Sequence, residues 1–209
     1  MTTADPHLPA PAHHAMLLDD LVHLFDATRI EHRVVEGTVP SVYTAVLEAD
    51  FVRAWKDNAA VRALAAVRST AEELFSRVQG RDFIAPPDIA SMRLAEMPEH
   101  GEWVRLGVNA PHEIAYGVIG RFWSGRTTWR TIDASDFASF SEAGFAKIGC
   151  NFSLRPYGNG RTLVSYEART KATDDDSRRQ FLRYWKAVSP GAGIVMRSML
   201  AVVEIQANR

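Results

Sequence analysis

The stretch from Thr173 to Arg209 constrains the fold of this chain more than any other stretch. It is the most strongly helical run in the sequence, and Asp175 and Asp176 place negative charge in a predicted first turn, where the backbone dipole favours it. A series of short strand-like segments joined by turns precedes it. This order predicts a helix laid across a curved antiparallel sheet, which is the shape of a container.

One proline divides this stretch. Proline inside a helix costs roughly 3 kcal/mol, but it is tolerated at a first helical position, and Ser189 before Pro190 is a good cap. The sequence therefore predicts two helices, a short one over Asp175–Ala187 and a largely buried one over Pro190–Ala207. The second helix is too short and too interrupted to span a membrane, so no integral membrane insertion is expected.

Composition bounds the class of protein. The chain has 209 residues, which fits one domain with a sizeable core, and its 24 basic and 25 acidic residues give a formal charge of −1. This balance of charges does not favour binding to nucleic acid or to an acidic membrane surface. The single cysteine, Cys150, excludes an internal disulfide framework and suits a reducing, cytoplasmic setting.

The N-terminal segment reads MTTADPHLPAPAHHA. It lacks a basic start followed by an apolar run, so no secretion signal is expected. Its proline, alanine and histidine content predicts a disordered tail over residues 1–15, followed by a single domain over residues 16–209.

Hydrophobic periodicity predicts the order of the elements. Helical spacing appears at residues 16–27, 40–47 and 57–79. Strand-like stretches appear at residues 29–39, 92–97, 103–108, 114–123, 127–132, 144–154 and 161–172, with a hairpin signal at 157–160. The pattern predicts an α+β fold in which about six or seven antiparallel strands wrap on the C-terminal helix, with two helices after the first strand.

The segment Val39-Pro40-Ser41-Val42-Tyr43 resembles the strand-to-helix entry of the START-like, SRPBCC superfamily, where an apolar residue, a proline and Val-Trp or Val-Tyr are common. Further stretches resemble a functionally uncharacterised bacterial SRPBCC group, namely residues 117–123, 167–170, 179–185 and 190–194. The resemblance covers about Leu17 to Ala207 and implies the helix-grip fold. It leaves function open, because this superfamily includes lipid carriers, hormone receptors, polyketide cyclases, ring-hydroxylase subunits and chaperone regulators.

Alternation along the strands predicts which side chains face the helix. The inward sets are apolar apart from tyrosine hydroxyls, and methionines from the helix complete them. The candidates for lining a ligand cavity are Tyr116, Val118, Phe122, Ile148, Cys150, Phe152, Val164, Tyr166, Met196 and Met199. The same residues would equally fill a core without a cavity.

Glu167 and Arg169 share one face of the last strand and can pair with each other or with Arg121. Inside a cavity, such a pair would orient a polar head group or shift the pKa of a carboxylate. On the surface it would be an ion pair worth at most about 1 kcal/mol, and the outward parity of the two residues favours this second interpretation.

Trp123, Tyr184 and Trp185 are expected to anchor the short helix to the sheet, with a gate over the cavity as the sharper alternative. The seven histidines form no ligand pattern, and only His32 sits where it can face inward, so no metal site and no cofactor are expected. Cys150 is expected to be a small buried hydrophobe rather than a nucleophile.

The leading functional prediction is non-enzymatic binding or carriage of a small apolar molecule, such as a lipid, isoprenoid or polyketide, with Tyr116 and Tyr166 supplying orienting hydrogen bonds. The first alternative is an enzyme of the polyketide cyclase or dehydratase kind, which needs an inward acid–base pair. The second is a protein-interaction module with a filled core and an exposed apolar patch at Phe137 and Phe140.

Overall fold

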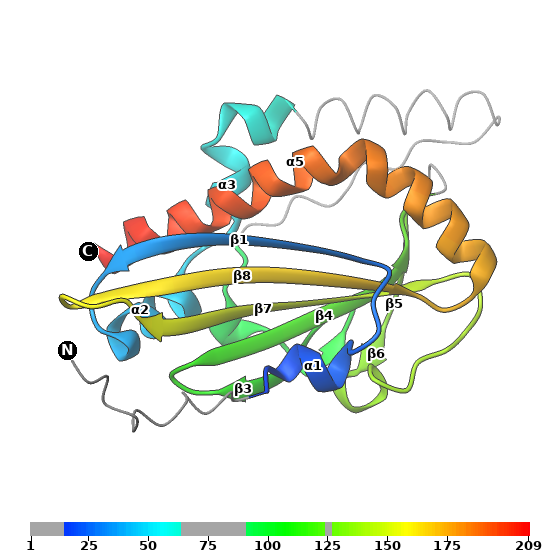
Figure 1. The fold of residues 1–209 in the computed structure, drawn as a ribbon, viewed down its shortest axis with the longest axis horizontal. Helices are drawn as coiled ribbons and strands as arrows, with labels where there is room; N and C mark the ends of the chain where they lie inside the picture. Colours follow the sequence, from blue (N-terminus) through cyan, green and yellow to red (C-terminus); the bar gives the residue numbers. More distant parts are fainter. Residues whose placement is uncertain (1–14, 64–90, 124–126) are drawn as a thin grey trace, which may run out of the picture.

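The computed structural model of the protein describes residues 15–63, 91–123 and 127–209. They form a six-stranded antiparallel sheet with a long helix lying along one face (Figure 1). Almost all of the predicted tail over residues 1–15 lies outside the described residues, as does most of the predicted helix over residues 57–79, of which residues 59–63 are helical.

The main sheet has the strand order β1-β8-β7-β4-β3. Strand β5 pairs with β4 beyond the end of β3, so β3 and β5 share one edge of the sheet. The strands are β1 (Ala27–Glu36), β3 (Trp103–Asn109), β4 (Glu113–Arg121), β5 (Thr128–Arg130), β7 (Ala146–Pro156) and β8 (Arg161–Ala172), and β2 (His100–Gly101) pairs separately with β6 (Ile132–Asp133). The sheet packed on a C-terminal helix confirms the predicted α+β, helix-grip arrangement.

The C-terminal stretch forms one continuous helix, α5 (Asp175–Ala207), with Pro190 inside it, so the prediction of two separate helices is wrong. Proline removes one backbone hydrogen bond and bends a helix, and Figure 1 shows α5 bending as it crosses the sheet. Phe181 before the proline and Met196 after it are both buried. Tertiary packing of both halves therefore outweighs the local cost of the proline.

By length and composition, α5 is the one helix among the described residues that qualifies as a membrane span. The expectation that the helix over Pro190–Ala207 is too short for one does not hold for α5, because these residues belong to a longer helix. In the fold, α5 lies along β1 and β8 and contacts α2 (Val39–Glu48).

Helices follow β1, as predicted. Val39 opens α2 instead of ending the strand, and Pro40 lies in the first turn, where its missing N–H has no partner to lose. The short helix α3 (Val52–Lys56) comes next. Among the described residues before β1, Leu17–Leu21 are helical and form α1. The predicted helix over residues 16–27 is therefore too long, and its last residue, Ala27, belongs to the strand.

The predicted strand over residues 92–97 is wrong, since Leu94–Glu96 form a single 3₁₀ turn. Backbone hydrogen bonds tie this segment to the connection between α2 and α3 rather than to the sheet: Phe51 donates its N–H to the carbonyl of Met92. Leu94 and Met97 are buried in the main core, so their apolar character reflects packing and not strand alternation.

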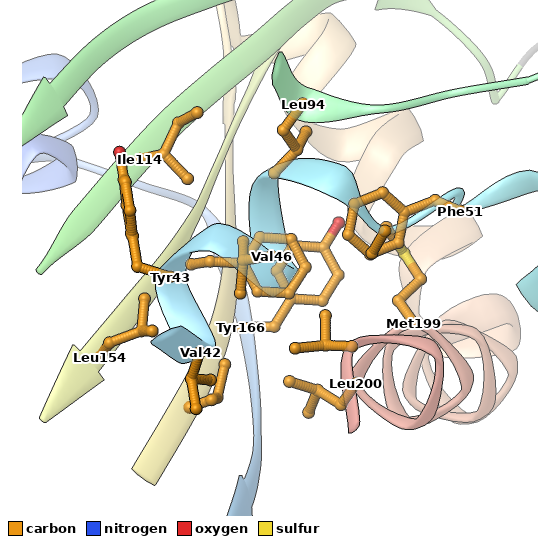
Figure 2. Close-up of a cluster of buried hydrophobic side chains, with 14 of the residues drawn as sticks. Val42, Tyr43, Val46, Phe51, Leu94, Ile114, Leu154, Tyr166, Met199 and Leu200 are labelled. Atoms are coloured by element: carbon orange, nitrogen blue, oxygen red, sulfur yellow. The ribbon is translucent and has the colours of Figure 1, made fainter. Parts of the chain in front are cut away.

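The inner face of the sheet, which faces α2 and α5, holds the main core. Alternate residues of β7 and β8 point to it, as the sequence predicts, and Phe152 and Tyr166 are buried there. Figure 2 shows how the two helices complete this core, with Val46 of α2 and Met199 and Leu200 of α5 around Tyr166.

The outer face of the sheet is covered as well. Leu18 and Val22, at and just after α1, lie so close to Gly149 of β7 that a Cβ there would approach them to within 3.0 Å. Asn151 and Ser153, which alternation places outward, are therefore buried under α1. A second cluster of buried residues continues beside them and consists of Val22, Val104, Ile119, Ile132, Phe137 and Phe145.

This second cluster removes one expected surface. Phe137 is fully buried and Phe140 is half-buried against the same cluster, so the exposed apolar patch expected at these two residues is absent.

Candidate functional site

An aromatic cluster lies where the first half of α5 meets the end of the sheet at which β5 pairs with β4 (Figure 1). Its members are Trp103, Phe122, Trp123, Trp129, Phe181, Tyr184 and Trp185. Phe181 is fully buried and the other rings are half-buried. The aromatic cluster therefore presents apolar surface that is partly open to solvent, an arrangement that suits contact with an apolar ring or chain.

Phe122 is the hub of the aromatic cluster. It follows β4 directly, and its ring centroid lies 5.2 Å from that of Trp123, 5.9 Å from Phe181 and 5.9 Å from Tyr184. The three partner rings stand edge-on to it, with interplanar angles of 76°, 81° and 64°. Edge-to-face contacts of this kind are the arrangement that aromatic quadrupoles favour, so the hub joins the sheet to α5.

Trp129 enters the aromatic cluster because β5 pairs with β4. Its cross-strand partner is Gly120, and a Cβ on Gly120 would lie 2.2 Å from Cε3 of the indole. Only glycine lets this ring lie flat on the strand. Trp129 then contacts Phe122 at 6.0 Å and Trp103, on the same edge of the sheet, at 6.4 Å.

Ring contacts continue from the aromatic cluster into the main core. Trp103 contacts Tyr116 at 5.9 Å, and Tyr116 stacks on Phe152 and on Tyr166, each at 6.4 Å. Phe152 stacks on Tyr166 at 4.5 Å and on Phe51 at 5.4 Å. A continuous series of aromatic contacts thus runs from the half-buried end of the fold into its interior.

The polar groups along this series bond each other. The Tyr116 hydroxyl donates to the Tyr166 hydroxyl at 2.8 Å, and both side chains are buried. Burial and the electrostatic effect of Cys150 raise the pKa values of both hydroxyls well above their usual value. Tyr166 raises the pKa of Tyr116 further, and the hydrogen bond from Tyr116 offsets only part of the rise at Tyr166. Both tyrosines are therefore neutral, and their pairing leaves the interior without a fixed charge at this point.

The structure places most of the predicted lining residues in the interior. Ile148 is half-buried against the main core, and Phe122 belongs to the aromatic cluster. The buried members of the set are Tyr116, Val118, Cys150, Phe152, Val164, Tyr166, Met196 and Met199.

The three predicted gate residues are brought together through two rings that they share. Trp123 contacts Phe122 and Phe181, Tyr184 contacts Phe122, and Trp185 contacts Phe181 at 6.0 Å. Sequence reasoning missed Trp103 and Trp129 as members of the same site. Their strands are short, and no local pattern says that β3 and β5 continue each other along one edge.

Glu167 and Arg169 lie on the outer face, away from the main core. Arg169 Nε contacts Glu167 Oε1 at 2.6 Å, and Arg169 Nη1 contacts Asp19 of α1 at 2.8 Å. The two side chains are 14% and 11% exposed, so α1 converts what alternation predicts to be a surface pair into a covered one. Arg121 takes no part and lies over the ring of Phe145.

Glu31 is the carboxylate between the sheet and α5 that two arginines hold. Glu31 of β1 receives hydrogen bonds from Arg29 at 2.6 Å and from Arg197 of α5 at 2.9 Å. Burial raises its pKa and the bonds from the two arginines lower it, with a net downward shift. Glu31 is therefore an anion held by two cations, which is a poor arrangement for a general acid.

His32 and Cys150 take structural positions. His32 is exposed on the outer face, where Nδ1 contacts Ser165 Oγ at 2.8 Å, so it does not face the interior. Burial raises the pKa of the Cys150 thiol to about 12. No group of three or more potential metal ligands occurs in residues 15–63, 91–123 and 127–209.

Two surface pockets lie among the described residues at opposite ends of α5. The larger, of about 620 Å³, lies at the C-terminal ends of α2 and α5, with Asp50, Arg93 and Arg209 among its lining residues. The smaller, of about 460 Å³, surrounds the start of α5 at Asp174. Neither pocket is lined by a predicted cavity residue or by the aromatic cluster.

No protein-family model matches the chain, and no curated protein matches it. Among solved structures, a hypothetical protein from Helicobacter pylori is 9% identical with a TM-score of 0.42, over 99% of each chain. A conserved protein from Geobacillus kaustophilus is 9% identical with a TM-score of 0.40, over 87% of this chain and 95% of that chain. A norcoclaurine synthase point mutant from Thalictrum flavum, in complex with a transition-state analogue, is 10% identical with a TM-score of 0.37, over 87% of this chain and 95% of that chain.

Proposed function

We propose that the protein binds a small, uncharged apolar molecule, and that the aromatic cluster is where this molecule enters. The observation that carries the proposal is the continuous series of ring contacts from half-buried Trp185 to buried Phe51. A molecule bound on the half-buried rings exchanges water for aromatic faces, and the buried rings of the series extend this apolar environment inward. The cytoplasmic setting expected from composition is part of the same proposal.

The energetics favour such a ligand over a charged one. Burying about 200 Å² of apolar ligand surface contributes roughly 5 kcal/mol before the costs of association. The hydroxyls of Tyr116 and Tyr166 are neutral and bonded to each other, so they offer no counter-charge to an anion. An ionised ligand would therefore leave water without compensation at the inner end of the series.

Tryptophan fluorescence tests the proposal. The aromatic cluster contains Trp103, Trp123, Trp129 and Trp185, so a ligand bound there changes the emission of most of the indoles of the chain. Titration with a neutral polycyclic hydrocarbon and with a long-chain alcohol is expected to give a saturable change. The carboxylic acid of the same chain length as the alcohol is ionised at neutral pH and is expected to bind more weakly.

Matched variants locate the binding. Phe122→Leu removes the hub ring and is expected to weaken binding at least tenfold, because a ring that contacts four others is lost. Phe140→Leu is the same substitution at a ring that packs against the second buried cluster, on the outer face of the sheet. It is expected to leave binding unchanged. Circular dichroism checks that both variants fold. Equal effects of the two substitutions would contradict binding at the aromatic cluster.

Native mass spectrometry of the protein from its own host supplies the identity of the ligand. A co-purifying molecule that Phe122→Leu loses and Phe140→Leu retains would support the proposal. An unliganded mass, together with no fluorescence response to any of the probes, would refute it.

A further inference from the structure

The short helix α1 is fastened to the outer face of the sheet at a buried polar pair. Leu17, its first residue, donates its backbone N–H to both carboxyl oxygens of Glu113, at 3.0 and 3.1 Å. Glu113 opens β4 and is 2% exposed. Leu18 and Val22 fill the space over Gly149 beside it. α1 therefore covers the same carboxyl group that holds it.

Glu113 also contacts a buried amide. Asn151 of β7 donates from Nδ2 to Oε1 of Glu113 at 2.5 Å, which is short for an N–H···O bond. Oδ1 of Asn151 is buried and has no hydrogen-bond partner among the described residues. Asn151 is a neutral donor, so it supplies no counter-charge to an ionised Glu113.

The charged groups around Glu113 oppose its ionisation. Asp19 of α1 and Glu167 of β8 both lie near it, and one guanidinium, that of Arg169, pairs with both of them, at 2.8 and 2.6 Å. Burial and these two carboxylates raise the pKa of Glu113, hydrogen bonds from Asn151 and Leu17 lower it, and the net shift is upward. A charged Glu113 would be a third anion beside Arg169, which is already paired with the other two.

The remaining charged or titratable neighbours are directed elsewhere. Arg155 of β7 reaches Sδ of Met16, just before α1, at 3.9 Å. His112, next to Glu113 in the chain, turns Nδ1 toward the carbonyl of Leu154 at 3.4 Å. Neither interaction supplies a counter-charge to Glu113.

We propose that α1 is a pH-sensitive strap, held on the sheet while Glu113 is protonated and released when Glu113 ionises. A group whose pKa is raised in the docked state stabilises docking fully below its ordinary value of 4.5, and this contribution is lost as pH rises through the raised pKa. Asp19 does not reverse this trend. A backbone hydrogen bond from Met16 and the contact with Arg169 lower the pKa of Asp19, so its contribution to docking is lost as pH falls and not as pH rises.

Amide hydrogen exchange on the full chain, from about pH 5 to about pH 8, tests the strap. The protection factors of the α1 amides are expected to fall by up to about tenfold for each pH unit above the pKa of Glu113. The protection factors of the β7 amides are expected to stay constant. Glu113→Gln mimics the protonated side chain and is expected to hold α1 at every pH. The control Glu31→Gln, at a carboxylate whose pKa is lowered, is expected to leave the pH dependence of α1 unchanged.

Two results would overturn the proposal: protection of α1 that does not change with pH in the wild-type protein, or the same pH dependence in Glu113→Gln. A carbon-13 titration of the Glu113 carboxyl group in the wild-type protein gives an answer that needs no variant. A midpoint above 4.5 that coincides with the loss of α1 protection supports the strap, and a midpoint at or below 4.5 refutes it.

Discussion

The guanidinium of Arg29 in β1 lies so close to Gly193 of α5 that a Cβ at position 193 would be 2.1 Å from Nη2. Nη1 of the same group donates to the carbonyl of Ser189 at 3.3 Å, and Nε and Nη2 bind Glu31. Ser189 precedes Pro190 and Gly193 follows it. Arg29 therefore ties the edge strand to the helix on both sides of the proline, and Gly193 is the residue that lets it approach.

Replacing Arg29 is expected to weaken the fold at this point. Arg29→Ala removes hydrogen bonds to Ser189 and Glu31 and is expected to lower the free energy of unfolding by about 1–3 kcal/mol in a urea titration. Arg53→Ala, which breaks an exposed pair with Asp57, is the control and should cost about 0.5 kcal/mol or less. Equal losses in the two variants would mean that Arg29 is only a surface residue.

Gly120→Ala is expected to disturb the aromatic cluster. The added methyl group meets Trp129 at 2.2 Å and the carbonyl of Thr128 at 3.0 Å, so the indole must move. The expected loss of stability is about 1–3 kcal/mol, with a shift in tryptophan emission. In a Trp129→Ala background, Gly120→Ala should cost less stability, because the clash with the ring is gone. Strictly additive losses from the two substitutions would contradict the contact between Gly120 and Trp129.

The buried tyrosine pair is expected to behave as a unit. Tyr116→Phe or Tyr166→Phe leaves one buried hydroxyl without its partner and is expected to cost about 1–2 kcal/mol in chemical denaturation. The double variant removes both polar groups and should cost less than the sum of the single changes. A double cost equal to that sum would show that the 2.8 Å bond contributes nothing.

The start of α5 is expected to make the stability of the fold depend on pH in strong acid. Backbone hydrogen bonds from Ser177 and Gly144, with that of Asp176 and the Ser177 hydroxyl, hold the pKa of Asp174 well below its usual value. A lowered pKa gives stability that is present above the ordinary value of 3.8 and is lost as pH falls through the lowered value.

Asp174→Ala is therefore expected to cost about 1–2 kcal/mol at neutral pH, through loss of the helix cap, and progressively less in strong acid. Thermal denaturation at a series of pH values measures the difference. Asp175→Ala, one residue further along the first turn, is the control and should have a smaller effect.

Cys150 is expected to be inert in the folded protein. Burial raises the pKa of its thiol to about 12, so only about one thiol in ten thousand is ionised at pH 8. Iodoacetamide at this pH should label the protein in denaturant and leave the native chain unmodified. Rapid labelling of the native chain would contradict the buried position.

Several features of the fold follow from local sequence alone. Alternation in β7 separates Phe152 from Asn151, and the turn residues before Arg161 predict the hairpin that joins β7 to β8. Such patterns predict elements correctly because a strand must bury one face whatever else the chain does. They do not reveal what covers the other face, so the burial of Asn151 under α1 was not predictable.

The sequence by itself determined the α+β class, the order of the main strands along the chain and the inward-facing position of residues such as Tyr166. These features depend on the spacing of neighbouring residues. Only the tertiary structure decided that α5 runs unbroken through Pro190, that Trp129 lies on Gly120, and that α1 encloses Glu113. The physical reason is the same in each case. A local preference, such as the helix-breaking tendency of proline, is worth a few kcal/mol, and contacts between residues far apart in the chain outweigh it.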